Sequence, residues 1–160
     1  MKKVIYYGHS SPLIFGKMIQ YVTRSAYNHG SVNMGGRIFE ASAIRNGVIE
    51  LSNIRNDVSF SVEVFMKEEH YYKYLSWLES MKTLAEYEYK VVIYFLLNRD
   101  SKNTNPNYVT CDEVMWYPFE HFMGLSKPYK ISNKRSSPKS ALYYINGFSS
   151  ARKYYDKSSD

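Results

Sequence analysis

The first 65 residues constrain the fold most, because short β-branched and aromatic stretches alternate there with turn residues. Five such stretches are expected to be strands: residues 2–7, 27–32, 37–41, 48–51 and 58–65. Gly35-Gly36 and Asn46-Gly47 separate neighbouring stretches and are typical hairpin turns. The pattern therefore predicts an antiparallel sheet.

Helical signals flank these strands. Ser11-Pro12 is expected to open a helix, because Ser is a good N-cap and Pro fits the first helical position. A second helix is predicted after Lys67, where five apolar side chains recur at helical spacing: Tyr71, Tyr74, Leu75, Leu78 and Met81. Residues 87–97 form a second apolar segment, in which a helix and a buried strand are hard to separate by pattern alone, and its length favours a helix. Together these elements indicate an α+β fold.

The 160 residues are expected to form one main domain, at 1–126, followed by a basic extension at 127–160. The first part holds 13 Lys/Arg and 13 Asp/Glu, whereas the extension holds eight basic and two acidic residues. A short helix is predicted at 140–145, ended by Asn146-Gly147, and the chain from Ser149 is expected to be frayed.

The charge distribution argues against a uniformly basic nucleic-acid-binding domain. The basic extension could make weak contact with an anionic surface, although such segments are more often only solvated. Nucleic-acid binding through this extension ranks lowest among the functions considered. The sequence shows no signal peptide and no apolar run long enough to span a bilayer, which favours a cytoplasmic protein. The oligomeric state is left open.

The chain contains a single cysteine, Cys111, so an internal disulfide is excluded. No Cys/His cluster has zinc spacing, and neither a metal nor a cofactor is expected. Thr110-Cys111-Asp112-Glu113 matches a capping box, which places Cys111 in the first turn of a helix. The helix dipole favours a thiolate there, whereas the neighbouring carboxylates of Asp112 and Glu113 oppose it.

His29 and Glu40 lie on two strands that a Gly-Gly turn would bring together. An imidazole beside an orienting carboxylate is the base of a nucleophilic site, and Cys111 supplies a nucleophile. Each residue taken singly has a more ordinary explanation, as a buried thiol, a hydrogen-bonded strand histidine and an exposed strand carboxylate. The three together indicate a cysteine active site.

Five segments also follow one another in a recognisable order: 10–25 as a loop, helix and T-x-S exit, then Y-N-H-G-S-V at 27–32, I-F-E-A at 38–41 with N-G-V at 46–48, Y-E-Y at 87–89 and T-C-D-E-V at 110–114. This order, with the histidine before the cysteine, resembles the circularly permuted NlpC/P60 group of papain-like cysteine peptidases and amidases. That group includes the YiiX-like peptidases and, more distantly, the lecithin retinol acyltransferase-like enzymes.

The resemblance implies a permuted papain-like fold, in which an antiparallel sheet packs against a nucleophile-bearing helix. Cys111 would be the nucleophile, His29 the general base, Glu40 the residue that orients the histidine, and Tyr87 an accessory near the oxyanion. The implied activity is a thiol hydrolase, or an acyltransferase, that acts on an amide (a peptide or cell-wall peptide) or a lipid ester through an acyl-enzyme. Gly30 departs from the group's pattern, which has an apolar residue after the histidine.

The main alternative is a non-catalytic binding or inhibitory protein that uses the papain-like fold for contact. The 17 tyrosines favour this possibility, because tyrosine offers a large amphipathic contact area at low entropic cost.

Overall fold

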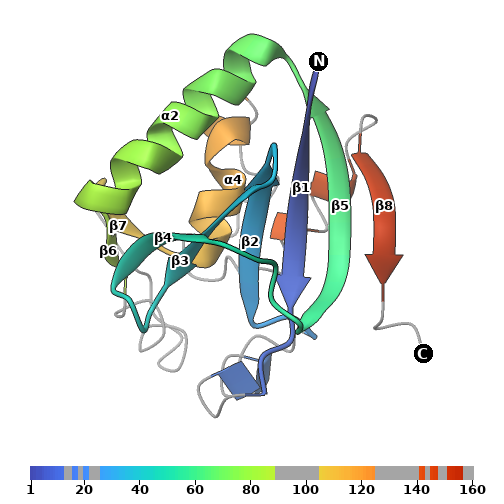
Figure 1. Cartoon of the computed structure of the whole chain (residues 1–160), viewed down its shortest axis with the longest axis vertical. Coiled ribbons are helices and arrows are strands. Elements are labelled where there is room, and N and C mark those ends of the chain that lie inside the picture. Colours follow the sequence, from blue (N-terminus) through green and yellow to red (C-terminus); the bar gives the residue numbers. More distant parts are fainter. Residues whose placement is uncertain are drawn as a thin grey trace.

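A computed structural model of the chain describes residues 1–12, 16–17, 20–21, 26–88, 105–124, 141–142 and 145–147, together with the backbone of 151–156. Within these ranges the fold is α+β, as the sequence predicted (Figure 1). Residues 16–17 and 20–21 are helical, in agreement with the helix expected after Pro12. The remainder of that predicted helix lies outside the described residues.

The main sheet has six strands in the order β4-β3-β2-β1-β5-β8, and every neighbouring pair is antiparallel. The strands are β1 (Lys2–His9), β2 (His29–Met34), β3 (Arg37–Ser42), β4 (Gly47–Leu51), β5 (Val58–Met66) and β8 (Ala151–Asp156). Gly35 and Gly36 both have positive φ, at 63° and 91°, and close the β2–β3 hairpin. The five predicted strands are therefore confirmed.

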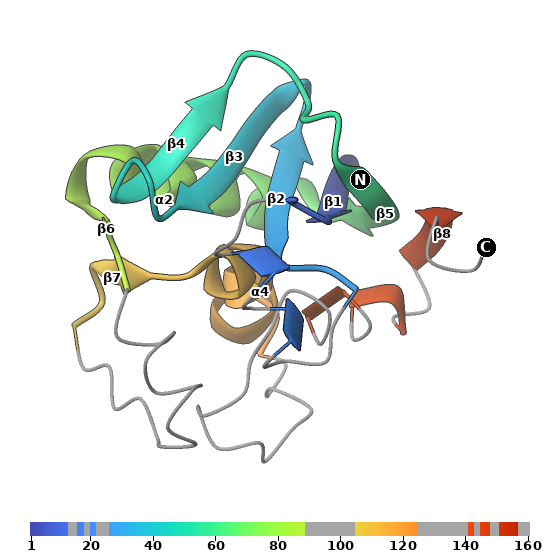
Figure 2. The same ribbon diagram turned by 90° about the horizontal axis from the view of Figure 1, so that it is seen from below.

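The two faces of this sheet differ in character. Val4 and Tyr6 of β1 lie opposite Met34 and Val32 of β2 and are fully buried with them. Because successive strand residues point to opposite faces, these side chains share one face and His29 belongs to the other. Figure 2 shows α4 (Cys111–His121) against one side of the sheet, while the segment from β4 to β5 passes on the other side.

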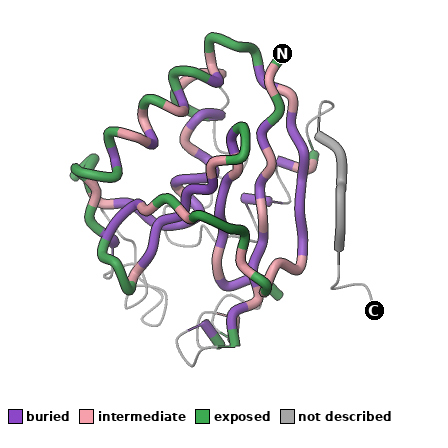
Figure 3. The backbone as a smooth tube through the Cα atoms, viewed as in Figure 1, coloured by how far each residue is buried: buried purple, intermediate pink, exposed green. Residues whose placement is uncertain are grey.

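Helix α2 (Glu68–Leu84) confirms the predicted apolar stripe. Its buried side chains are Tyr71, Tyr74, Leu78 and Met81, and they belong to one core with side chains of α4. Figure 3 shows how buried and exposed positions alternate along the backbone of α2. The exposed residues of α2 follow its outer side, as expected for an amphipathic helix.

Helix α4 continues through Pro118, although a proline inside a helix usually kinks or ends it. Proline has no N–H, so the carbonyl of Val114, four residues earlier, lacks its usual helical donor. The hydroxyl of Tyr74 on α2 donates to this carbonyl at 2.6 Å. The tertiary structure thus supplies the hydrogen bond that the proline removes.

The segment after α2 begins differently from the helix that its length favoured. Residues Glu86–Tyr87 form β6, which pairs in parallel with β7 (Tyr108–Val109). The prediction of a helix is therefore wrong at the start of residues 87–97, because backbone pairing with β7 competes successfully with helix formation. Residues 89–104 lie outside the described part of the chain.

The C-terminal segment also differs from its expected fraying. Residues 141–142 and 145–146 are helical and 147 is a turn, in agreement with the predicted short helix. Beyond it, β8 pairs antiparallel with β5 and extends the main sheet. The exposed backbone edge of β5 provides a pairing partner that composition alone does not reveal.

Among the described helices, none is both long and apolar enough to cross a membrane.

Candidate functional site

His29 and Glu40 are brought together by the β2–β3 hairpin. Ser31 pairs with Glu40, so His29, two residues earlier, lies diagonally across from the carboxylate on the same face. The Nε2 atom of His29 lies 2.8 Å from Oε2 of Glu40. The imidazole is 15% exposed and the carboxylate 4%. The predicted histidine–carboxylate pair is thus formed, with the histidine partly accessible.

Glu40 is held in its ionised form by surrounding groups. Burial would raise the pKa of this carboxyl, but the hydrogen bond and charge of His29, with the charge of Arg55, hold it below its ordinary value. An ionised carboxylate only accepts hydrogen bonds, so Nε2 of His29 carries the proton. The Nδ1 atom is then the ring nitrogen available as a base.

A second imidazole, His9, lies beside the first. His9 pairs with His29 across β1 and β2, and the ring centroids are 5.6 Å apart. Its Nδ1 lies 3.0 Å from Oδ1 of Asp57, and its Nε2 lies 2.7 Å from the hydroxyl of Ser31. Burial, aided by the charge of His29, lowers the pKa of His9 to about 4, so this ring is neutral near pH 7.

The Ser31–His9–Asp57 chain has the connectivity of a serine triad, but Ser31 and His9 are completely buried. No substrate reaches a hydroxyl in such a position, so these residues support the site instead of reacting. His9 is the last residue of β1, which places it beside His29 at the start of β2. The sequence contains no signal for Asp57, which lies in the segment between β4 and β5.

Cys111 occupies the first turn of α4, as predicted. Oε2 of Glu113 accepts hydrogen bonds from the backbone N–H of Thr110 at 2.8 Å and from its hydroxyl at 2.9 Å. The thiol is buried, and burial together with the charges of Asp112 and Glu40 raises its pKa above the ordinary value. The resting thiol is therefore protonated.

Gly30 explains how closely α4 approaches β2. A Cβ atom at this position would lie 2.4 Å from Cε and 2.6 Å from Sδ of Met115. Met115 lies one helical turn after Cys111, and the sulfur of Cys111 has polar contacts with the backbone of Gly30 and Asp112. The departure from the apolar residue expected at position 30 is thus a packing requirement.

The structure does not join all three predicted catalytic residues directly. Gly30 faces Met115 of α4, so the preceding residue, His29, points to the opposite face of β2. Within the described part of the chain, the polar contacts of the Cys111 sulfur are with backbone groups and not with the imidazole. The thiol and the imidazole therefore flank the first residues of β2 from its two sides.

Tyr87 lies buried in β6, beside Val109 of β7. Its backbone N–H donates to Oδ1 of Asn46 at 3.2 Å. This contact ties β6 to the turn before β4 and so fixes the strand that runs alongside the entry to α4. The suggested role of Tyr87 at an oxyanion stays a prediction.

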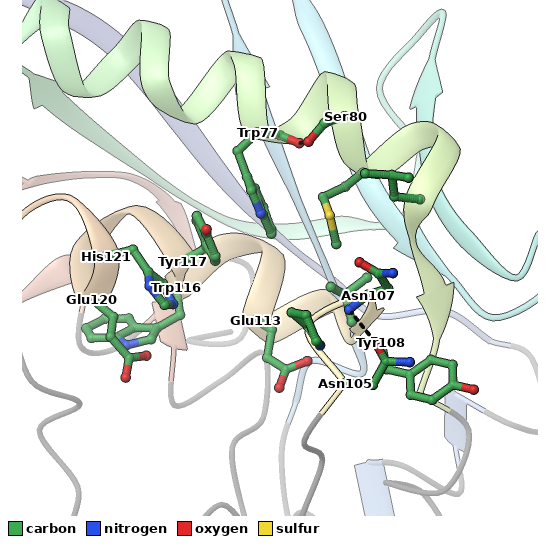
Figure 4. Close-up of a pocket in the computed structure, with 14 residues that line it drawn as sticks. Trp77, Ser80, Asn105, Asn107, Tyr108, Glu113, Trp116, Tyr117, Glu120 and His121 are labelled. Atoms are coloured by element: carbon green, nitrogen blue, oxygen red, sulfur yellow. Dashed lines mark hydrogen bonds between the residues drawn. The ribbon is translucent and has the colours of Figure 1, made fainter.

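A pocket of about 560 Å³ lies between α2, α4 and the segment 105–109 (Figure 4). Aromatic rings form one wall, where Trp77 stacks on Tyr117 with 3.7 Å between centroids. Glu113 and Glu120 add carboxylates to the lining. Neither Cys111 nor His29 is among the described residues that line it, so this pocket is separate from the candidate site.

No group of three or more His, Cys, Asp or Glu side chains suited to hold a metal ion occurs in the part of the chain that the structure describes. No protein-family model matches the chain, and no curated protein matches it significantly. The resemblance to the permuted NlpC/P60 group therefore rests on the quoted segments alone.

Proposed function

We propose that the chain is a cysteine hydrolase of permuted papain-like fold that cleaves an amide or ester through an acyl-enzyme. The observation that carries this proposal is the His29–Glu40 pair, in which Nε2 and Oε2 lie 2.8 Å apart. His29 directly precedes Gly30, whose backbone contacts the Cys111 sulfur. The capped helix start at Cys111 gives additional support, because a helix N-terminus stabilises a thiolate.

In the proposed reaction, Nδ1 of His29 takes the thiol proton and the sulfur attacks the carbonyl carbon of the substrate. The backbone N–H of Cys111 stabilises the oxyanion, with Tyr87 as an accessory. The imidazolium then protonates the leaving amine or alcohol, which leaves a thioester. Water, deprotonated by His29, hydrolyses this thioester and regenerates the thiol. Glu40 orients the imidazole throughout.

The reaction requires the imidazole and the thiol to meet at the end of β2. Apo enzymes often have long or poorly aligned catalytic hydrogen bonds that shorten only with substrate bound. His29 is the first residue of its strand and partly exposed, so its ring is less confined than one in the middle of the sheet. Substrates of this class are peptides, cell-wall peptides or lipid esters.

The test is the rate at which iodoacetamide alkylates the native protein, followed by mass spectrometry. Because Cys111 is the sole cysteine, every adduct reports on this thiol. We expect His29→Ala to slow alkylation at pH 6–7 about tenfold or more, since the thiol is protonated at rest and the variant lacks the base that takes its proton. His70→Ala on α2 is the matched control and should alkylate like the wild type. Equal rates in wild type and His29→Ala would refute the proposal.

The second candidate function is non-catalytic binding or inhibition on the same fold. The burial and raised pKa of Cys111 favour it, because an unactivated thiol is a structural residue. The acyl-enzyme separates the two candidates. A hydrolase incubated with p-nitrophenyl acetate acquires an acetyl group on Cys111 in a His29-dependent manner, whereas a binding protein remains unmodified.

A further inference from the structure

Arg55 joins the two histidine–carboxylate pairs of the candidate site. It lies in the segment between β4 and β5, and its side chain is 32% exposed. Its Nε and Nη2 atoms donate to the two oxygens of Asp57 at 3.1 and 2.8 Å. Its Nη1 atom lies 3.6 Å from Oε1 of Glu40. One guanidinium therefore bridges two carboxylates, each of which contacts a different histidine.

The segment that carries Arg55 is anchored to the site. The backbone N–H of Ser10, just after β1, donates to the carbonyl of Asp57 at 2.9 Å. Asp57 also accepts from Nδ1 of His9 at 3.0 Å. A two-pronged arginine–carboxylate pair fixes both position and orientation, which a lysine does not. The guanidinium is consequently held where it faces Glu40.

The two oxygens of Glu40 thus have different partners. Oε2 faces Nε2 of His29, and Oε1 faces Arg55. The other ionisable groups that act on Glu40 are His9 from β1 and Cys111 from α4. Arg55 is charged at every pH of interest, whereas His9 is neutral near pH 7 and the thiol is protonated.

We propose that Arg55 is a positioning residue of the site, which holds Glu40 as the ionised acceptor of the His29 Nε2 proton. This inference rests on the proposed function, in which Glu40 orients the general base. Without the guanidinium, the almost completely buried Glu40 protonates more readily. A protonated carboxyl can donate to Nε2, and the ring proton of the neutral imidazole then resides on Nδ1, which can no longer act as the base.

The first experiment follows the Glu40 side-chain carboxyl by carbon-13 NMR as the pH is varied in the full chain. We expect Arg55→Met to move the Glu40 titration midpoint upward by about one pH unit, the lower end of the effect of an adjacent charge. Arg55→Lys retains the charge without the fork and should bring the midpoint part of the way back. Arg37→Met removes an exposed arginine–carboxylate pair from β3 and should leave Glu40 unchanged.

The second experiment measures iodoacetamide alkylation of Cys111 against pH in the same variants. We expect the acid limb of the Arg55→Met profile to move to higher pH, so that the alkylation rate at a fixed pH on this limb falls about tenfold when the limb moves by one pH unit. A uniform loss at all pH values, or a lowered melting temperature with an unmoved Glu40 midpoint, would indicate a merely structural role and overturn the inference.

The two proposals fail in different ways. Equal alkylation of wild type and His29→Ala overturns the hydrolase, whatever Arg55 does. A His29-dependent thiol combined with an unchanged Glu40 midpoint in both Arg55 variants overturns only the role of Arg55. Thermal unfolding of each variant shows whether it is folded, and Arg55→Lys provides the measurement should Arg55→Met not fold.

Discussion

Replacing Gly30 by alanine tests the packing that brings the Cys111 helix onto β2. The backbone at Gly30 is extended, so alanine can adopt it without strain. The added methyl group would lie 2.4 Å from Cε of Met115, whose side chain is fully buried. The substitution therefore has two opposing effects on the free energy of unfolding: it restricts the unfolded chain and it overpacks the core.

The magnitudes decide the sign. Glycine-to-alanine replacement at a compatible position stabilises a protein by about 0.4–1 kcal/mol, because it lowers the entropy of the unfolded chain. Overpacking a filled core costs about 1–3 kcal/mol. The clash involves a methionine end, the most adaptable of core groups, which keeps the cost from the upper part of this range. We expect a net destabilisation of about 0.5–1.5 kcal/mol, which is the overpacking cost less the entropic gain.

Urea denaturation followed by circular dichroism measures this free energy of unfolding. The corresponding fall in melting temperature is about 1–6 °C for a chain of this size. The same variant should also change the alkylation rate of Cys111, because the thiol contacts the Gly30 backbone and lies one turn from Met115.

A double-mutant cycle with Met115→Ala identifies the cause. Met115→Ala alone should cost about 2–5 kcal/mol as a core truncation. In that background the clash is absent, so Gly30→Ala should become neutral or stabilising, with a coupling energy of about 1–2 kcal/mol, the cost of the clash itself. Equal destabilisation by Gly30→Ala in both backgrounds would refute the reasoning, since it would place the cost in the strand backbone and not at Met115.

Three further predictions concern stability. The pKa of His9 is lowered to about 4 from an ordinary 6.5, so between these pH values the unfolded chain binds a proton that the folded chain does not. The free energy of unfolding should therefore fall by about 3 kcal/mol as the pH is lowered from 6.5 to 4. His9→Gln should remove this loss in urea titrations at pH 7 and 4.5, and parallel curves for the two proteins would contradict it. Tyr74→Phe should cost about 1–3 kcal/mol by leaving the Val114 carbonyl without its donor. That cost should shrink in a Pro118→Ala background, where the new N–H reaches the carbonyl, and an unchanged cost would disprove the compensation. Glu113→Ala should destabilise the chain by about 1 kcal/mol in thermal unfolding while Glu113→Gln recovers most of it, and equal losses would argue against the capping box.

Local signals in the sequence predicted much of the fold. The Gly35-Gly36 and Asn46-Gly47 turns set the hairpins, and an apolar stripe identified α2. The capping signature placed Cys111 at the start of α4. These features depend on residues close together in the chain, which is why pattern and turn chemistry were sufficient to find them.

Other elements depended on partners distant in sequence. The start of the 87–97 segment is a strand because β7, some twenty residues later, pairs with it. Residues 151–156 form a strand because β5 leaves an edge to pair with. Helix α4 passes through Pro118 with Tyr74 serving the Val114 carbonyl. No local propensity contains this information, since each partner is chosen only when the chain is compact.

The candidate site likewise combines features set by local sequence with features set by distant partners. The sequence by itself determined that His29 and Glu40 would meet, because a short hairpin fixes the register of its two strands. Only the tertiary structure decided on which face of β2 the Cys111 helix packs, through the contact of Met115 with Gly30. It also placed Arg55, from the segment between β4 and β5, beside Glu40. Side-chain direction relative to a distant helix depends on core packing, and core packing is not a local property of the chain.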